Sequence, residues 1–282
     1  MRILIIGSGY LGKRCHESWG DSVLTDKKIA TKQDVLDLIE EHQPDVILNA
    51  AGVVGKPNVD WCETHQVETI EGNTILPLII AEACQEKNIY LLHMGTGCIF
   101  YGTNPTGQPW NEGDYANPVA VYTRAKYSAD LVLETLPNVG IARIRMPIDD
   151  QSHPANLIDK LAKFEKVIDV ENSLTVVPDM IKVFHELLEK KAVGIFHCTN
   201  PGSITHKEIM TLYEKYVDPQ HKNEWITEGE LVSCGLAVKK RSNNIMRSIR
   251  LKEYGLEMRE VHEAVEDAIK QYSEKVSTQM SQ

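Results

Sequence analysis

Apolar and polar positions alternate in blocks along the first half of the chain. Residues 3–6 read Ile-Leu-Ile-Ile, a continuous apolar run that is typical of a parallel strand buried on both faces. The same reading predicts strands at residues 22–25, 45–52, 89–94 and 140–145, and helices at about 10–19, 33–43, 74–87 and 122–136. Strands that alternate with helices predict an α/β fold with a doubly wound parallel sheet of the Rossmann type.

The alternation becomes weaker after about residue 150. Helices are predicted at residues 156–166, 179–190, 205–216 and 261–275, with strands at 173–177 and 194–198. Thr205 stands three residues before Glu208, the spacing of a capping box at a helix N-terminus. We predict a nucleotide-binding domain over 1–150 and mainly a substrate-binding lobe over 151–282, with one or two elements able to return to the main sheet. The cleft between them is the expected substrate site.

A glycine-rich loop follows the first predicted strand directly and opens a helix. Its sequence is G-x-G-x-x-G, in the strand-to-helix context that a dinucleotide-binding fingerprint requires. The first glycine allows a tight turn, the second a close approach of the pyrophosphate, and the third close packing of helix on strand. The phosphates would meet the helix N-terminus. The candidate cofactor-binding residues here are Gly7, Ser8, Gly9, Tyr10, Leu11 and Gly12.

Charged residues after the second predicted strand bear on the choice of cofactor. Asp26 would accept a hydrogen bond from a ribose 2′-hydroxyl and favour NAD, whereas Lys27 and Lys28 would pair with the 2′-phosphate of NADP. Both kinds of residue are present, and a solvated charged turn is the alternative reading for at least one of them. Small residues after the third strand, Asn49-Ala50-Ala51-Gly52, permit close approach of the adenosine side.

Hydroxyl, thiol and amine groups are concentrated between residues 93 and 126. Tyr122 and Lys126 are four positions apart and project from one helical face, so the ammonium is expected beside the phenol and to lower its pKa. Thr96, at the carboxyl end of a predicted strand, would hydrogen-bond the same carbonyl oxygen. This trio would polarise a ketone. Cys98 follows two residues later, and a buried cysteine is more often a small core residue than a catalyst.

Composition and charge exclude some partners. The 282 residues carry a formal charge of −10 and the pI is about 5.5, which argues against a nucleic-acid or anionic-membrane binder. Six widely spaced cysteines without a C-x-x-C pair indicate reduced thiols and no metal site. No apolar run reaches the ~18 residues of a membrane span, and no leader pattern is present. We therefore expect a cytoplasmic protein.

Four motifs in order, the glycine loop, residues 49–52, Thr96 and Tyr122-x-x-x-Lys126, resemble an extended short-chain dehydrogenase/reductase. Further segments resemble the nucleotide-rhamnose synthase epimerase/reductases, relatives of dTDP-4-dehydrorhamnose reductase. These segments lie at residues 49–63, 96–100, 143–148, 164–167, 199–202 and 241–244. The resemblance covers roughly residues 1–270.

The resemblance implies a role for each group of residues. Thr96, Tyr122 and Lys126 would form the reductase trio, and Cys98 and Lys166 would shuttle protons during epimerisation at C3 and C5. Met146 would join the cofactor-binding residues, with NADP(H) favoured over NAD(H). The implied substrate-binding residues are Val54, Lys56, Asn58, Cys98, Asn200, Arg241 and Asn244.

The implied activity is conversion of a UDP- or dTDP-linked 4-keto-6-deoxyglucose to nucleotide-linked L-rhamnose, by 3,5-epimerisation and 4-reduction with NADPH. One alternative is a reductase that needs a separate epimerase. Another is a non-catalytic NADP-binding regulatory protein, because the regulatory subunit of methionine adenosyltransferase resembles the same reductases. The intact Thr96, Tyr122 and Lys126, together with Cys98, favour an enzyme. A homodimer is one expected assembly by analogy with the superfamily.

Overall fold

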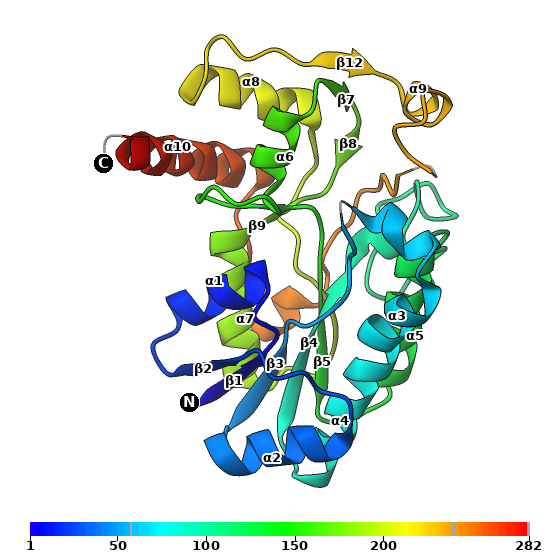
Figure 1. Cartoon of the computed structure of the whole chain (residues 1–282), viewed down its shortest axis with the longest axis vertical. Coiled ribbons are helices and arrows are strands. Elements are labelled where there is room, and N and C mark those ends of the chain that lie inside the picture. Colours follow the sequence, from blue (N-terminus) through cyan, green and yellow to red (C-terminus); the bar gives the residue numbers. More distant parts are fainter. Residues whose placement is uncertain (57, 239–240, 281–282) are drawn as a thin grey trace.

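Within the residues that the computed structural model describes, 1–56, 58–238 and 241–280, the central sheet has six parallel strands in the order β10-β5-β4-β3-β1-β2 (Figure 1). Their bounds are β1 Ile3–Ile6, β2 Ser22–Thr25, β3 Val46–Asn49, β4 Tyr90–Thr96, β5 Val139–Ile144 and β10 Gly194–His197. The predicted doubly wound parallel sheet is confirmed. Pro57, within the segment 49–63, lies outside the described residues.

Helices cover both faces of the sheet, which explains why its strands are continuously apolar. One face carries α1 (Tyr10–Ser18) and α7 (Val177–Lys190), and the other carries α2 (Lys32–His42), α4 (Leu76–Glu86) and α5 (Val121–Leu133) (Figure 1). Alternate residues of β1 enter the two cores: Ile3 and Ile5 face α1 and α7, and Leu4 and Ile6 face α2 and α4. The strands are parallel, so the two helical layers hold all their carboxyl ends along the same side of the sheet.

Short helical turns connect the strands near that edge. They are η1 (Val59–Glu63), α3 (Gln66–Ile70), η2 (Glu71–Ile75) and η3 (Gly97–Ile99). The π-type turn η2 leads without a break into α4, so the helix predicted from residue 74 has an earlier beginning. Turn η3 follows directly on β4 and places Cys98 just beyond the strand.

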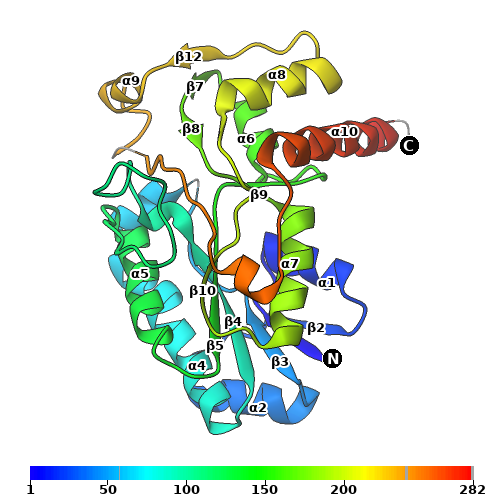
Figure 2. The ribbon, with the colours of Figure 1, turned by 180° about the vertical axis from the view of Figure 1, so that it is seen from behind.

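The second half of the chain forms a smaller lobe beyond one end of the sheet (Figure 2). Its helices are α6 (Leu157–Lys163), α8 (His206–Tyr216), α9 (Glu228–Ser233) and α10 (Val261–Met280). Its short strands are β6 (Pro147–Ile148), β7 (Lys166–Ile168), β8 (Glu171–Asn172), β9 (Thr175–Val176), β11 (Ile204–Thr205) and β12 (Glu224–Ile226). They pack around a core of their own, which includes Leu174, Ile209 and Val265. The predicted capping box of Thr205 and Glu208 is confirmed.

Residues from the second half also complete the main sheet. Strand β10 pairs in parallel with β5, and α7 packs on the face that α1 covers. The segment 241–258 likewise runs back to the sheet, where the turn η4 (Leu251–Tyr254) packs against the α7 side. In the part of the chain that is described, no helix is long and apolar enough to cross a membrane.

Two predicted elements are wrong in their extent. The helix predicted over 156–166 ends at Lys163, and Lys166 instead begins strand β7, which pairs with β12. The run Lys166-Val167-Ile168 has β-branched residues, which favour a strand. The strand predicted over 173–177 is reduced to β9, and Val177 already begins α7 because Pro178 favours the first turn of a helix.

Candidate functional site

The glycine loop forms a tight backbone turn between β1 and α1. Gly7 has a φ of 111°, and a Cβ there would lie 2.5 Å from the amide nitrogen of Ala51. A Cβ on Gly12 would lie 2.0 Å from the carbonyl oxygen of Gly7, so neither position admits a side chain. A Cβ on Gly9 would meet nothing within 4 Å. The open space at Gly9, in front of the N-terminus of α1, fits a bound pyrophosphate.

Side chains of α1 fasten this loop to the segment that follows β6. The Tyr10 hydroxyl donates to Asp149 at 2.7 Å, and the Tyr10 ring stacks on His153 with centroids 4.2 Å apart. Arg14 is buried and pairs with Asp149 at 2.7 Å and with Asp150 at 3.0 Å. Burial raises the pKa of Asp149, but hydrogen bonds from Arg14 and Tyr10 outweigh it and hold the pKa below its usual range. No local pattern predicts this contact, because its partners are more than 130 residues apart in the chain.

The residues after β2 are all exposed. Asp26, Lys27 and Lys28 stand beside one another at the end of the strand, and the Lys27 ammonium lies 3.9 Å from Asp37. Asp26 and the two lysines, the candidates for binding the adenosine ribose or its 2′-phosphate, therefore lie on the same exposed surface.

The carboxyl end of β3 lies next to α5. The side-chain oxygen of Asn49 accepts from the amide of Ala51 at 3.0 Å, and its amide nitrogen lies 3.0 Å from Nδ1 of the buried His93. A Cβ on Gly52 would lie 3.9 Å from the Lys126 ammonium. The small residues 49–52 thus approach one member of the predicted catalytic trio.

Thr96 and Tyr122 come together at the end of β4. The Tyr122 phenol interacts with the Thr96 side chain, and the Thr96 hydroxyl accepts a hydrogen bond from the amide of Cys98 at 3.2 Å. Burial raises the pKa of Tyr122, and the interaction with Thr96 only partly opposes that rise. The prediction that Lys126 lowers the Tyr122 pKa is wrong for this structure, because desolvation of the phenol is the larger effect.

Lys126 points along α5 to the main chain of β4. Its ammonium donates to the carbonyl oxygen of Met94 at 2.8 Å, and the residue is only 5% exposed. Burial lowers the pKa of Lys126 to about 8, with the neighbouring Asp130 opposing that shift. Asp130 is itself buried and pairs with Arg143 at 2.8 Å. Lys126 therefore titrates near neutral pH, unlike an ordinary lysine.

Cys98 lies in η3, half-buried, with a cation on each of two elements beside it. The guanidinium of Arg145, directly after β5, lies 3.5 Å from the Cys98 sulfur. Burial lowers the pKa of Lys160, on α6, and its electrostatic interaction with Cys98 raises it. The Lys160 side chain is exposed to solvent.

Lys166, which the resemblance implies as the partner of Cys98, is in strand β7. It is exposed at the start of β7, and its ammonium pairs with Glu224 at 3.3 Å. The hydrogen bonds and charge of Glu224 raise the pKa of Lys166. The structure thus gives Lys166 a surface ion pair and gives Lys160 the electrostatic contact with Cys98. Lys160 is one of several charged residues of its helix, so the sequence pattern alone did not indicate an interaction with Cys98.

Two loops that carry substrate-binding candidates are joined by an ion pair. Arg241 binds Asp60 through both guanidinium nitrogens at 2.9 and 3.0 Å. Asn58 caps η1 by accepting from the amide of Asp60 at 2.8 Å, and Val54 and Lys56 are exposed in the same loop. Apart from Val54, the side chains named here are polar, and they lie in the two loops that the Arg241–Asp60 ion pair joins.

Asn244, Asn200 and Met146 occupy three different environments. Asn244 donates to the carbonyl oxygens of Phe100 at 2.7 Å and Gly97 at 3.2 Å, so it supports the turn that holds Cys98. Asn200 is fully buried and donates to Asp179 at 2.8 Å, which keeps its amide within the protein. Met146 follows β5 in a left-handed conformation with a φ of 40°.

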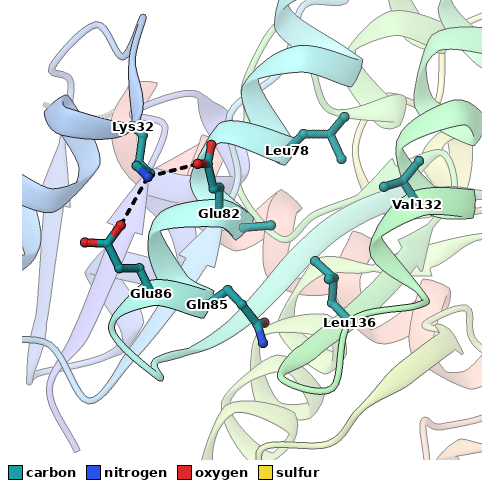
Figure 3. A pocket seen from close by; sticks show the side chains of 8 residues that line it. Lys32, Leu78, Glu82, Gln85, Glu86, Val132 and Leu136 are labelled. Carbon is teal, nitrogen blue, oxygen red and sulfur yellow. Dashed lines mark ion pairs between the residues drawn. The ribbon is translucent and has the colours of Figure 1, made fainter.

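A surface groove lies elsewhere, between α2, α4 and α5 (Figure 3). Lys32 pairs there with Glu82 at 2.9 Å and with Glu86 at 3.1 Å, beside Leu78 and Val132. None of the predicted site residues lines it. The chemistry-bearing residues gather instead where β1, β3, β4 and β5 end.

Comparisons with known proteins point to one family. The model described as the RmlD substrate binding domain matches residues 1–274. A bifunctional dTDP-4-dehydrorhamnose 3,5-epimerase/dTDP-4-dehydrorhamnose reductase from Arabidopsis thaliana is 35% identical over 263 residues, which is 91% of this chain and 87% of that protein. A trifunctional UDP-glucose 4,6-dehydratase/UDP-4-keto-6-deoxy-D-glucose 3,5-epimerase/UDP-4-keto-L-rhamnose-reductase from the same plant is 33% identical over 276 residues. That match covers 94% of this chain but only 41% of the longer protein.

Solved structures show the same architecture. The L780 UDP-rhamnose synthase from Acanthamoeba polyphaga mimivirus superimposes with a TM-score of 0.88 at 26% identity, covering 96% of this chain and 99% of that one. A dTDP-4-dehydrorhamnose reductase from Bacillus anthracis, solved in complex with NADP, gives a TM-score of 0.80 at 20% identity. That likeness covers 97% of this chain and 98% of the other, and it shows the shared fold.

Proposed function

This chain belongs to the RmlD substrate binding domain family, and from that premise we propose that it is an NADP-dependent enzyme of the short-chain dehydrogenase/reductase type that makes a nucleotide-linked L-rhamnose. The substrate is a nucleotide-linked 4-keto-6-deoxyglucose, inverted at C3 and C5 and then reduced at C4. The observation that carries the proposal is the meeting of Thr96, Tyr122 and Cys98 at the end of β4. That arrangement offers a proton donor for a ketone and an acid–base group for the carbons beside it.

Reduction needs a proton at the C4 oxygen when hydride reaches C4. Bound NADPH supplies the hydride. Because burial raises its pKa, Tyr122 keeps its proton at neutral pH, the form that a general acid needs. The Thr96 side chain, which interacts with Tyr122, is placed to hold the same oxygen. Lys126, beside Gly52 and the end of β4, is placed to hold the nicotinamide ribose.

Epimerisation needs a base on one face of the carbon beside the ketone and an acid on the other. We assign the base to the Cys98 thiolate, which takes the proton while the electron pair moves onto the C4 oxygen. The Lys160 ammonium then returns a proton from the opposite face, and solvent restores both groups. We place Lys160 in this role instead of Lys166, because Lys160 interacts with Cys98 and Lys166 pairs with Glu224.

The test is product analysis by NMR with purified protein, NADPH and 4-keto-6-deoxyglucose linked to UDP or to dTDP. We expect an L-rhamnose product with one of the two nucleotides and oxidation of one NADPH per sugar. Recovery of the starting sugar without NADPH oxidation contradicts the proposal. Reduction without inversion at C3 and C5 identifies a reductase alone.

A matched pair of variants separates the two steps. Cys98→Ser is expected to lose inversion but to reduce a sugar already epimerised. Lys166→Met is expected to keep both steps, whereas Lys160→Met loses inversion. A homodimer is also part of the proposal, and sedimentation of the full chain tests it.

A further inference from the structure

Arg145 is a buried cation that donates a hydrogen bond to the Cys98 thiol. It is 1% exposed, and its Nη1 donates to the Cys98 sulfur at 3.5 Å and to the Ser242 hydroxyl at 3.0 Å. Its Nη2 donates to the Asn172 side chain and to the Ser242 carbonyl oxygen. Within the described part of the chain, its Nε has no partner. Several neutral contacts therefore hold the guanidinium in one position against the sulfur.

Arg143, two residues earlier, is a buried arginine whose positive charge is paired with a carboxylate. Its side chain is equally buried and pairs with the Asp130 carboxylate at 2.8 Å. Among the described residues, Arg145 makes no ion pair with a carboxylate. Burying a charge without an opposite charge beside it is energetically costly. The atom near Arg145 that can become an anion at little cost is the Cys98 sulfur.

The other titratable groups around Cys98 do not supply a competing anion at neutral pH. Tyr101 and Tyr122 both interact with Cys98, and burial raises the pKa of each phenol, so both stay neutral. Lys160 approaches from α6 as a second cation. Burial lowers the pKa of Arg145, and the neighbouring sulfur opposes that shift. Arg145 and Lys160 both interact with Cys98 and both are cations, the charge that stabilises a thiolate.

We propose that Arg145 is a positioning residue that keeps Cys98 as a thiolate and aims its sulfur at the sugar carbons next to the ketone. The inference rests on the proposed function and deepens it, because it names what prepares the base. Lys160 is on a solvent-facing helix and gives up a proton in the reaction, so its charge is not constant through the cycle. Arg145 does not exchange its proton and is fixed by Asn172 and Ser242.

The experiment measures alkylation of Cys98 by iodoacetamide against pH, in the full chain without substrate, with the modified peptide quantified by mass spectrometry. Exposed Cys234 is the reference thiol in the same molecule. In the wild type we expect Cys98 to reach half of its maximal rate at a lower pH than Cys234. Arg145→Gln is expected to slow Cys98 alkylation at pH 7 by about 10-fold or more, since a cation within ~4–6 Å shifts a partner by one to three pH units. Arg145→Lys should restore part of the Cys98 alkylation rate.

Two results would overturn the inference. One is a wild-type Cys98 that reacts over the same pH range as Cys234, a measurement that needs no variant to fold. The other is an Arg145→Gln protein, folded by circular dichroism, whose Cys98 pH profile is unchanged. A second readout is exchange of solvent deuterium into C3 and C5, whose rising limb should move to higher pH in Arg145→Gln. Alkylation needs no sugar substrate. It therefore tests whether Arg145 controls Cys98 even if the exchange experiment shows no epimerase activity.

Discussion

The glycine loop after β1 and the acid–base cluster after β4 lie on the same edge of one sheet but are built in opposite ways. The loop is formed by backbone packed on backbone, so that a single methyl group at Gly12 would lie 2.0 Å from a carbonyl oxygen. The cluster is formed by side chains whose acidities are set by burial, such as Tyr122 and Lys126. A substitution that adds volume should therefore disrupt the glycine loop, whereas a substitution that removes a titratable group should disrupt the acid–base cluster.

The largest expected effect is on the acid–base cluster. Tyr122→Phe removes the general acid and should lower kcat for C4 reduction by about 10²–10⁴-fold, with NADPH affinity retained. Tyr127→Phe, on the same helix, is the matched control, because the Tyr127 hydroxyl only accepts from the Ala116 amide. Stopped-flow NADPH oxidation gives kcat, and fluorescence titration gives the affinity. A Tyr122→Phe enzyme within tenfold of wild type would contradict the assignment.

The next effect is on the contact that fastens the loop. Arg14→Met leaves Asp149 buried without its cation, while Asp150 keeps its ion pair with Lys275, and should lower the unfolding free energy by about 3–5 kcal/mol. Lys222→Met is the control, because its pair with Glu214 is just as short but exposed, and should cost only about 0–1 kcal/mol. Urea unfolding measures both. Equal losses in the two variants would show that burial of the pair does not matter.

The same pair predicts an acid sensitivity with a definite sign. The folded-state pKa of Asp149 is held below its usual value, so its stabilising contribution is present above the ordinary carboxyl range near ~3.9 and is lost as pH falls through the folded-state pKa. Arg14→Met should remove this part of the acid dependence. Unfolding curves between neutral pH and the acid limb test it.

Two glycine substitutions separate folding from cofactor binding. Gly12→Ala forces the loop apart and should cost about 1–3 kcal/mol of stability as well as NADPH affinity. Gly9→Ala meets open space in the protein, so it should leave stability within about 0.5 kcal/mol and weaken NADPH binding alone. Thermal unfolding and NADPH titration of both variants provide the measurement. A Gly9→Ala protein that binds NADPH normally would argue against this cradle.

The smallest effect is a pH dependence of reduction. Because burial lowers the pKa of Lys126 to about 8, its ammonium is lost above that pH, and kcat should fall by up to about tenfold per unit there. The sign for stability is opposite. Between about 8 and the usual 10.5, the unfolded chain binds the additional proton, so this group makes the unfolding free energy rise with pH. Lys126→Met should lose that rise, and an unchanged pH profile of its stability would contradict the assignment.

The two regions also differ in how far the sequence predicted them. Gly7 and Gly12 follow β1 directly, and the constraint that requires glycine acts within a few residues, so a local pattern was sufficient. The same is true of the sheet, whose strands carry apolar runs because both faces are covered. Fold class and cofactor loop were therefore accessible from the chain alone.

The acid–base cluster depends on contacts between distant residues, and there the sequence was less informative. Thr96 and Tyr122 could be proposed as neighbours, but the direction of the Tyr122 pKa shift follows from burial, which no spacing reveals. Lys160 interacts electrostatically with Cys98 although 62 residues separate them in the chain, and no local pattern reveals that interaction. Arg145 looked like one more residue of a strand, and its lack of a carboxylate partner appears only when the neighbours are assembled.

The place of β10 in the sheet has a consequence for how the protein is made. Strands β1 to β5 are complete by Ile144, yet one side of β5 is covered only by β10, which begins at Gly194. While the chain leaves the ribosome, about fifty residues must therefore be added before β5 finds its last neighbour, or roughly 3–10 s at ~5–20 residues per second. During that interval β5 is an apolar edge strand, open to pairing with another nascent chain. The yield of soluble protein should therefore depend on the speed of translation between these two strands.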